Sequence, residues 1–314
     1  MLRTIILERI DSLGLENFKS FSKVKEFYDK PRNEILKVIR NFEIIVIKST
    51  IKVDEEFLKH SKKIKVVARA GTGLDNINQK LLKKKNVKLF SIPKGNTVAA
   101  AEYIMCMILM LAKKISLIED MIKNNDFSRH NILSMQLDSS TVGIIGLGNV
   151  GMEVVNRLVP FGCRVLGFDK KKIDKEKIKN FNIKLCKKIS EVLKKSDIIV
   201  LCATLNEKSR KIINKENYKT IKKGCYLVNC ARAELIDQDI LLKGLNEKVF
   251  EAAALDLISP EPTYAKKKQS MHPLFYHPRV FYSPHVAALT DISQKKIANL
   301  LANKVKKYLT KDKI

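Results

Sequence analysis

The stretch TVGIIGLGNVG, residues 141–151, decides how this chain is organised. Its first five residues are almost all apolar, as a strand buried on both faces of a parallel sheet requires. Gly146, Gly148 and Gly151 then give the pattern Gly-x-Gly-x-x-Gly and lead into the helical sequence VVNRLVPF. A strand, a glycine turn and a helix in this order suit the pyrophosphate of a dinucleotide, because the helix N-terminus attracts phosphate. The stretch therefore predicts a dinucleotide-binding domain.

A carboxylate occupies the position that distinguishes NAD from NADP in dinucleotide-binding domains. The apolar run Arg164 to Phe168 ends at Asp169, 18 residues after Gly151. A carboxylate at this position accepts hydrogen bonds from the adenosine ribose and repels a 2′-phosphate, so the sequence predicts NAD as the cofactor. Three lysines follow directly, at positions 170 to 172, and leave some use of NADP open.

The chain is strongly basic, with 60 Lys and Arg residues against 33 Asp and Glu residues and a formal net charge of +27. Short lysine clusters are scattered along the sequence and do not form one basic arm. Aromatic residues make up only 7% and Trp is absent, so stacking platforms for single strands are poor. We interpret the lysines mainly as solvated surface that also steers anionic ligands, and we expect no specific nucleic-acid partner.

Neither the cysteines nor the apolar runs indicate an extracellular or membrane protein. The six cysteines show no CxxC pair and no metal-ligand spacing, so we expect reduced core thiols and no metal site. The N-terminus lacks the apolar core and cleavage site of a signal peptide. The longest apolar run, Tyr103 to Ala112, is shorter than the about 20 residues of a membrane span. The sequence predicts a cytoplasmic protein.

Strand-like and helical segments alternate along the whole chain, which predicts an α/β fold with two doubly wound parallel-sheet domains. A long helix is expected from about Val98 to Lys123. From the glycine turn onward, strands are expected at residues 141–145, 164–168, 197–202, 225–230, 252–257 and 280–283. An amphipathic segment from Asp291 to Leu309 should pack back on the first domain. The expected domains are residues 1–96 with 291–314, and residues 97–290.

Three polar side chains follow expected strands, at the edge of an open α/β sheet where ligands bind. Arg232 follows CYLVNC, Glu261 follows AAALDL by four residues, and His285 follows VFYSP. Hydride transfer to a keto acid needs a cation for the carboxylate, and the two-pronged guanidinium suits that task. It also needs a proton donor, and histidine has a reference pKa of about 6.5, near working pH. The three residues are therefore predicted to be catalytic.

The segments TVGIIGLGNVG, NCARAELID, AAALDLISPEP and SPHVAALT resemble, in order and spacing, the signature segments of the D-2-hydroxyacid dehydrogenase family. The resemblance covers nearly the whole chain. It implies a Rossmann NAD-binding domain, a smaller flavodoxin-like lid domain, and a homodimer built around the long helix. It also implies that Glu261 and His285 form the acid–base dyad and that Asp256 lies beside the nicotinamide carboxamide. The implied cofactor-binding residues are Gly146, Gly148, Asn149, Val150, Gly151, Asp169, Ala231 and Asp256.

Within this family the lid resembles the phosphoglycerate dehydrogenase subgroup, through ARAGTGLDNIN and GNTVAAAEY. This likeness implies that the Gly-Thr-Gly turn presents its backbone to the substrate carboxylate, that Asn96 binds substrate, and that Arg69 with Lys48 serves a phosphate. The implied substrate-binding residues are Lys48, Arg69, Gly71, Thr72, Gly73, Asn96 and Arg129. Because the chain ends at Ile314, the likeness is to the short form without a C-terminal regulatory domain.

Several positions depart from the family pattern. Ala233 replaces the usual Gly after the catalytic Arg, and Thr204 replaces a Pro near the adenine pocket. Phe127 replaces a Trp before Arg129. Lys48 stands where the subgroup commonly has Arg, and a point charge holds phosphate with less directional specificity than a guanidinium.

These observations predict an NAD-dependent oxidoreductase that oxidises 3-phospho-D-glycerate to 3-phosphohydroxypyruvate, in serine biosynthesis. The substrate would be a small anionic 2-hydroxy or 2-keto acid. Two alternatives stay open: a reductase for hydroxypyruvate, glyoxylate or another 2-keto acid, and an NAD-sensing interaction protein on the same scaffold. A basic nucleic-acid binder is a third and weaker alternative, which would require affinity that persists at high salt.

Overall fold

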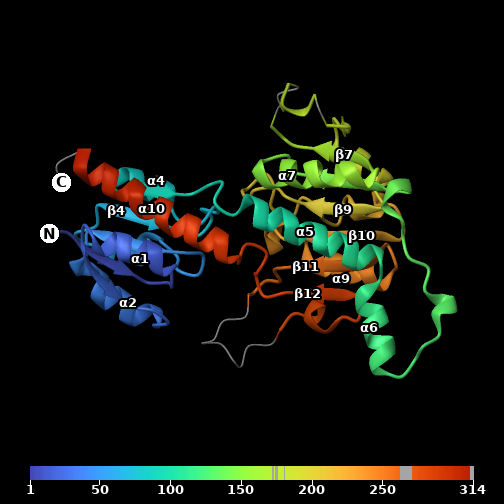
Figure 1. The fold of residues 1–314 in the computed structure, drawn as a ribbon, viewed down its shortest axis with the longest axis horizontal. Helices are drawn as coiled ribbons and strands as arrows, with labels where there is room; N and C mark the ends of the chain where they lie inside the picture. Colours follow the sequence, from blue (N-terminus) through green and yellow to red (C-terminus); the bar gives the residue numbers. More distant parts are fainter. Residues whose placement is uncertain (172, 174–175, 180, 262–270, 312–314) are drawn as a thin grey trace. The chain divides into compact units, whose positions relative to one another are not determined.

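The computed structural model describes residues 1–171, 173, 176–179, 181–261 and 271–311. Lys172, the last of the three lysines that leave some use of NADP open, lies outside these ranges. The chain forms two compact units (Figure 1). The first contains residues 1–96 and the segment from Leu289 onward, and the second contains residues 97–288. Each unit is built on its own parallel sheet, which confirms the predicted α/β class with two doubly wound domains.

The first unit has a five-stranded parallel sheet in the order β2-β1-β3-β4-β5. Its strands are β1 (Arg3–Ile6), β2 (Lys23–Glu26), β3 (Ile44–Ile47), β4 (Val66–Arg69) and β5 (Lys88–Ser91). This is the doubly wound order of flavodoxin-like sheets. The central strands β3 and β4 are buried along their whole length, as strands covered on both faces must be.

Helices cover both faces of this sheet. They are α1 (Ser12–Lys19), α2 (Arg32–Val38), α3 (Glu55–His60), α4 (Gln79–Lys84) and α10 (Asp291–Lys311). One core cluster joins the sheet to α2, α3 and α4, and a second joins its other face to α1 and α10. The C-terminal helix α10 lies along α1 and contacts β4 and β5, so residues far apart in sequence complete this unit (Figure 1).

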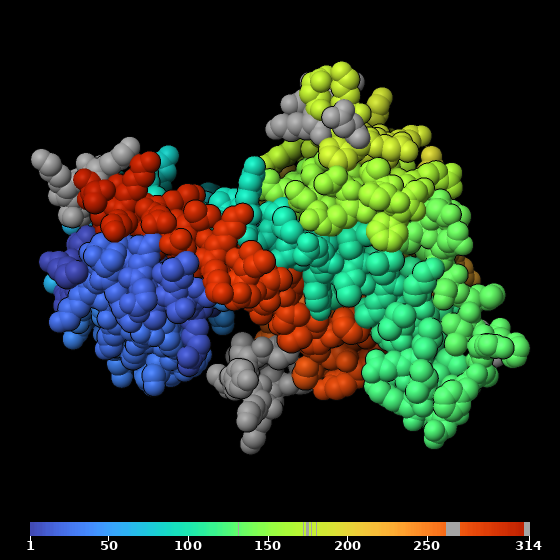
Figure 2. Space-filling model, viewed as in Figure 1, coloured from blue at the N-terminus to red at the C-terminus, as the bar shows by residue number. Residues whose placement is uncertain are grey.

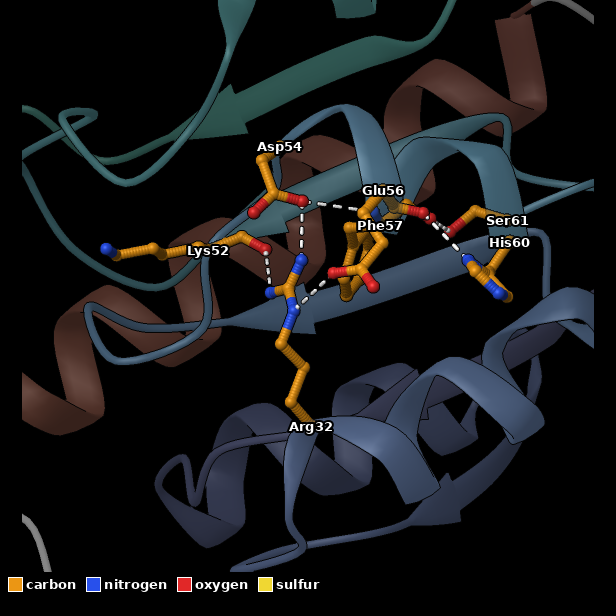
Figure 3. A network of polar contacts seen from close by, with 7 residues as sticks. All are labelled: Arg32, Lys52, Asp54, Glu56, Phe57, His60 and Ser61. Atoms are coloured by element: carbon orange, nitrogen blue, oxygen red, sulfur yellow. Dashed lines mark hydrogen bonds and ion pairs between the residues drawn. The ribbon is translucent and has the colours of Figure 1, made fainter. Parts of the chain in front are cut away.

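An ion-pair network fixes the start of α3 to α2 (Figure 3). The Arg32 guanidinium donates to Asp54 Oδ1 at 2.5 Å, to Glu56 Oε2 at 2.9 Å and to the Lys52 carbonyl at 3.2 Å. Asp54 is also the N-cap of α3 and accepts from the Phe57 amide. Burial alone would raise the pKa of the Asp54 carboxyl, but these hydrogen bonds and the Arg32 charge outweigh burial and lower the pKa. The network therefore orders the loop that follows β3.

The second unit has a seven-stranded parallel sheet in the order β12-β11-β10-β9-β6-β7-β8. Its strands are β6 (Thr141–Ile145), β7 (Arg164–Phe168), β8 (Ile183–Leu185), β9 (Ile198–Leu201), β10 (Cys225–Asn229), β11 (Phe250–Leu255) and β12 (Val280–Tyr282). The order matches the dinucleotide-binding fold, extended by one strand. All six expected strands are present. Only β8 was missed, because it is a three-residue, partly exposed edge strand.

Five helices of the described chain belong to this unit: α5 (Thr97–Ala112), α6 (Ile115–Lys123), α7 (Asn149–Leu158), α8 (Ile189–Lys195) and α9 (Gln238–Asn246). Helices α5 and α7, which lie near each other in Figure 1, share one core cluster with the sheet. Helices α8 and α9 share the second cluster of this sheet. Among the helices of the described ranges, none combines the length and the apolar composition that a membrane span needs.

The single long helix expected from Val98 to Lys123 is wrong, because the structure has two helices there. Helix α5 ends at Ala112, and Lys114 takes a left-handed φ of +54° before α6 begins. The carbonyl groups at the end of α5 are satisfied by a distant segment: the Met135 amide donates to Ala112 at 2.8 Å. The Lys113 ammonium in turn donates to the Met135 carbonyl. These contacts replace the next helical turn and end α5.

Candidate active site

The glycine turn after β6 is closed where its backbone packs and open where phosphates would lie. Gly146 has a φ of +102°, and a Cβ on it would lie 2.5 Å from the Ala203 nitrogen. A Cβ on Gly151 would collide with the Gly146 carbonyl oxygen. A Cβ on Gly148, the N-cap of α7, would meet nothing within 4 Å. The turn therefore fits a pyrophosphate at Gly148 and the first amides of α7, including that of Asn149.

Asp169 is fixed at the mouth of this turn. It directly follows β7, and its Oδ2 accepts from the Leu147 amide at 2.8 Å. Its Oδ1 accepts from the Lys171 amide, also at 2.8 Å. Each carboxylate oxygen can accept a second hydrogen bond, so both can still bind hydroxyl groups. The carboxylate is held where a ribose beside the glycine turn would place its hydroxyls.

A cleft of about 400 Å³ joins these features. It lies at the carboxyl ends of β6, β7 and β9, beside the point where the strand order reverses, which is the usual ligand position in such sheets. Residues that line it include Gly146, Gly148, Asp169, Lys170, Thr204 and Lys208. The Lys170 ammonium donates to the Lys208 carbonyl. The rim of the cleft is basic because both of these lysines line it. Val150 continues the first turn of α7 behind the cleft.

The thiol of Cys202, at the end of β9, also lines the cleft. Burial raises its pKa to about 12, so it stays a protonated and unreactive thiol at neutral pH. All six cysteines are free thiols. Cys106 on α5 is exposed, so the expectation of core cysteines is wrong for that residue.

Arg232, Glu261 and His285 follow three neighbouring strands, β10, β11 and β12, and therefore share one edge of the sheet. His285 Nδ1 lies 3.1 Å from Glu261 Oε2, and the two side chains are 32% and 47% exposed. The pair is thus ordered but reachable from solvent. His285 also has a φ of +57°, a conformation that costs a non-glycine residue on the order of 1–3 kcal/mol and that its surroundings must impose.

Asp256 is fully buried and anchors the segment that carries His285. Its Oδ1 accepts from the Ser283 hydroxyl at 2.6 Å and from the Val286 amide at 2.9 Å. Its Oδ2 accepts from the Ala287 amide at 3.0 Å. The carboxylate expected to meet a nicotinamide carboxamide is therefore also the structural support of this loop.

Arg232 stands in a turn that a buried amide organises. The Asn229 side chain, 0% exposed at the end of β10, donates to the Arg232 carbonyl at 2.9 Å and accepts from the Ala231 amide at 3.1 Å. The Arg232 guanidinium donates to the Ala231 carbonyl at 2.6 Å. Ala233, where the resemblance leads one to expect Gly, is 4% exposed and has an accommodated methyl group.

The first unit brings together most of the residues expected to bind substrate. Thr72 Oγ1 lies 2.5 Å from Asn96 Oδ1, so the Gly-Thr-Gly turn is joined to the segment before α5. Arg69, at the end of β4, is 6% exposed, and its guanidinium occupies the space where a Cβ on Gly71 would lie. Gly71 is therefore required for this close approach. Gly73 is partly buried in the same turn.

Lys48 lies near Arg69 and completes a cationic pair in this unit. Burial lowers the pKa of the Lys48 ammonium, the nearby Glu8 carboxylate opposes this change, and the Arg69 charge lowers the pKa further. Its Nζ donates to Gln294 Oε1 at 2.9 Å, and its amide donates to Glu8 Oε2 at 2.6 Å. Lys48 follows β3, Arg69 ends β4 and Gln294 belongs to α10. These three elements therefore come together at two positively charged side chains.

Arg129 lies in the second unit, in an exposed 3₁₀ turn (Arg129–Asn131) that follows α6. This segment carries exposed apolar side chains as well: Phe127 is 76% exposed and Leu133 is 81% exposed. Helix α6 itself buries none of its residues. Such a surface is typical of a contact region rather than of a free monomer surface.

The sequence prediction missed three polar residues that support these groups. Asn229 is the only polar side chain in the strand CYLVN apart from Tyr226. A polar side chain at the end of a buried strand was the signal that could have identified Asn229. Ser283 gave no such signal, because a Ser before Pro is ordinary loop sequence. Gln294 lies more than 200 residues from Lys48 in the chain, and only the fold brings the two together.

Residues 105–287 match the family model described as D-isomer specific 2-hydroxyacid dehydrogenase, NAD binding domain. The chain is 30% identical over 309 residues to the D-3-phosphoglycerate dehydrogenase of Methanocaldococcus jannaschii, a match that covers 98% of this chain and 58% of that protein. It therefore spans less than two thirds of that relative's length. It is also 30% identical over 278 residues to the hydroxypyruvate reductase of Thermotoga maritima, with 88% of each covered.

Solved structures with the same fold include enzymes for different acids. The D-lactate dehydrogenase of Aquifex aeolicus, complexed with NAD and lactic acid, superposes with a TM-score of 0.87 at 28% identity and covers 99% of this chain and 96% of that one. A glyoxylate reductase from Paecilomyes thermophila gives a TM-score of 0.87 at 23% identity, with 98% and 95% covered. At that identity the second match speaks for the fold alone.

Proposed function

The chain belongs to the D-isomer specific 2-hydroxyacid dehydrogenase family, with residues 105–287 as its NAD binding domain, and from that premise we propose that it oxidises 3-phospho-D-glycerate. The product would be 3-phosphohydroxypyruvate. The observation that carries the choice of substrate is the pairing of the partly buried Lys48 with the buried Arg69 in the first unit. Two adjacent positive charges suit a phosphate dianion better than a lone carboxylate, because each would be partly neutralised by it.

We propose the following roles for the residues at the sheet edge. Arg232 binds the substrate carboxylate and polarises the carbonyl through its forked donors. The neutral imidazole of His285 accepts the proton of the C2 hydroxyl as the carbonyl forms. Glu261 orients the ring through the 3.1 Å contact and stabilises the imidazolium. A nicotinamide bound in the second unit would accept the C2 hydride in this direction.

The lid residues would fix the rest of the substrate. The backbone of Gly71, Thr72 and Gly73 would bind the carboxylate, with Asn96 held beside it by Thr72. Arg129 would add a further cation to the substrate region. This arrangement supports a small anionic acid as substrate, and the basic surface of the chain would speed its encounter.

We propose NAD rather than NADP, because Asp169 is fixed where a 2′-phosphate would meet its charge. The cofactor set would comprise the glycine turn with Asn149 and Val150, together with Asp169, Ala231 and Asp256. The open space at Gly148 supports this assignment. Lys170, Lys171 and Lys208 around the same cleft favour a measurable, weaker use of NADP.

We further propose a homodimer that works in the cytoplasm in serine biosynthesis. The exposed apolar side chains of α6 and the segment after it support the dimer, and Figure 2 shows this segment, in green, at the edge of the second unit. Covering Ile122, Phe127 and Leu133 would remove apolar surface that a monomer leaves in water.

The experiment that tests the substrate follows loss of NADH with 3-phosphohydroxypyruvate, hydroxypyruvate, glyoxylate and 2-ketoisocaproate in turn. The proposal expects kcat/KM to be highest for the phosphorylated acid, by about a hundredfold, which corresponds to one charge-assisted phosphate contact. In Lys48→Met that advantage should shrink while rates with glyoxylate stay close to wild type. The alternative, a hydroxypyruvate reductase, is favoured by the Thermotoga relative. It predicts a higher kcat/KM for hydroxypyruvate than for 3-phosphohydroxypyruvate.

A further inference from the structure

The loop that carries His285 is tied by its backbone to one buried carboxylate. The Asp256 side chain accepts from the amides of Val286 and Ala287, at 2.9 and 3.0 Å. The Asp256 carbonyl accepts from the His285 amide at 2.8 Å. Three consecutive amides therefore bind one residue. Together they impose the left-handed backbone of His285, since a non-glycine residue keeps that conformation only where its surroundings hold it.

One buried hydroxyl group stands behind this carboxylate. Ser283 is 5% exposed, and its hydroxyl donates to Asp256 Oδ1 at 2.6 Å. The charge of the carboxylate strengthens this hydrogen bond, because a bond to an ionised acceptor is shorter and stronger than a neutral one.

We infer that Ser283 is a positioning residue, which holds the Asp256 carboxylate in the orientation that places the His285 ring against Glu261. The inference deepens the proposed function and rests on it for the role of His285. Removing the Ser283 hydroxyl would leave a buried carboxylate oxygen short of a donor, and the carboxylate would turn to recover one. The loop amides bound to it would follow. A displacement of about 1 Å at a reacting group costs up to about a hundredfold in rate.

A merely structural role for this hydroxyl would also lower stability, so the test needs readouts that a change in stability alone leaves unaltered. We compare Ser283→Ala in the full chain with Ser283→Thr, which restores a hydroxyl. The matched control is Ser196→Ala, which removes the hydroxyl of another buried serine of the same unit, one that donates to the Val192 carbonyl.

The first readout is hydrogen–deuterium exchange of the amides at residues 285–287, and the second is kcat. We expect exchange at these amides to accelerate by at least about tenfold in Ser283→Ala. We expect kcat to fall by at least about tenfold in the same variant. Ser283→Thr should restore both.

Unchanged exchange at residues 285–287 in Ser283→Ala would overturn the inference, whatever happens to kcat. Faster exchange with an unchanged kcat would also overturn it, because the loop would then be held without consequence for His285. If the wild-type protein turns over none of the acids, the proposed function fails. The exchange result then still decides whether Ser283 holds the loop.

Discussion

His285 Nδ1 lies 3.1 Å from Glu261 Oε2, although the two residues are 24 positions apart and follow different strands of the sheet. Neither side chain is fully buried, so the pair can exchange protons with a ligand or with water. The Asp256 anchor holds one side of this contact through the loop amides. The geometry is that of a base whose partner fixes its ring and balances its charge.

Replacing either member of this pair should lower turnover. We expect His285→Ala to reduce kcat by about a hundredfold or more, and Glu261→Gln to reduce it by about tenfold or more, because acid–base catalysis contributes on that scale. Steady-state rates with NADH and the preferred acid measure both. His60→Ala, which alters an exposed histidine on α3, is the control and should keep the wild-type rate. A wild-type rate in His285→Ala would remove this residue from the chemistry.

The proposed role of Lys48 in binding phosphate should depend on pH, because its pKa is lowered. Lys48 loses its proton below the ordinary lysine value of 10.5, so KM for the phosphorylated acid should rise as alkaline pH approaches that value. In the same window the unfolded chain binds more protons than the folded one, so the free energy of unfolding rises with pH. Lys48→Arg, whose guanidinium keeps its proton, should make KM nearly independent of pH.

The control for this change is Lys94→Arg, at an exposed lysine of the same unit, which should leave the pH profile of wild type unaltered. The measurement is KM against pH for the phosphorylated acid and for glyoxylate in parallel. An identical alkaline rise of KM in wild type and in Lys48→Arg would show that another group titrates. Lys48 would then have no part in binding phosphate.

Cofactor preference should follow the charge of Asp169. Asp169→Asn keeps hydrogen-bond acceptance from the Leu147 amide but removes the charge, so we expect the NAD over NADP preference to shrink by about tenfold or more. Asp169→Ala should in addition weaken NAD binding itself. Fluorescence titration with NADH and NADPH measures both effects. An unchanged preference in Asp169→Asn would mean that the basic rim, and not this carboxylate, sets the choice.

The exposed segment after α6 should control assembly. We expect the double variant Phe127→Asp with Leu133→Asp to sediment as a monomer at concentrations where the wild type sediments as a dimer, because two charges would enter an apolar contact. Tyr276→Asp changes a similarly exposed aromatic residue elsewhere and should stay dimeric. Analytical ultracentrifugation distinguishes the two. A wild type that sediments as a monomer would contradict the dimer.

Local patterns in the sequence were enough to predict the two parallel sheets. Buried strands such as Ile198–Leu201 are continuous apolar runs. The glycines that begin at Gly146 have the Gly-x-Gly-x-x-Gly spacing that a dinucleotide-binding turn requires. The strand-end rule led to Arg232, Glu261 and His285, because carboxyl ends of neighbouring parallel strands meet at one edge. These inferences use only residues close together in the sequence.

The features that the sequence did not reveal depend on contacts between distant segments. Helix α5 ends at Ala112 because the Met135 amide, 23 residues further on, takes its carbonyl, and no helix-ending residue marks the place. The Ser283 hydroxyl, after β12, donates to Asp256, which follows β11. Such hydrogen-bond partners are set by the packing of the sheet and its helices. Local secondary-structure propensity therefore does not predict them.

The most direct test of the central claim uses NADH deuterated at the transferred position of the nicotinamide, with the preferred 2-keto acid and either wild type or His285→Ala. A D-2-hydroxyacid dehydrogenase should place one deuterium at C2 of a product of D configuration, and His285→Ala should slow that transfer by about a hundredfold without changing its stereochemistry. Product without deuterium at C2, or of L configuration, would contradict direct hydride transfer at this site.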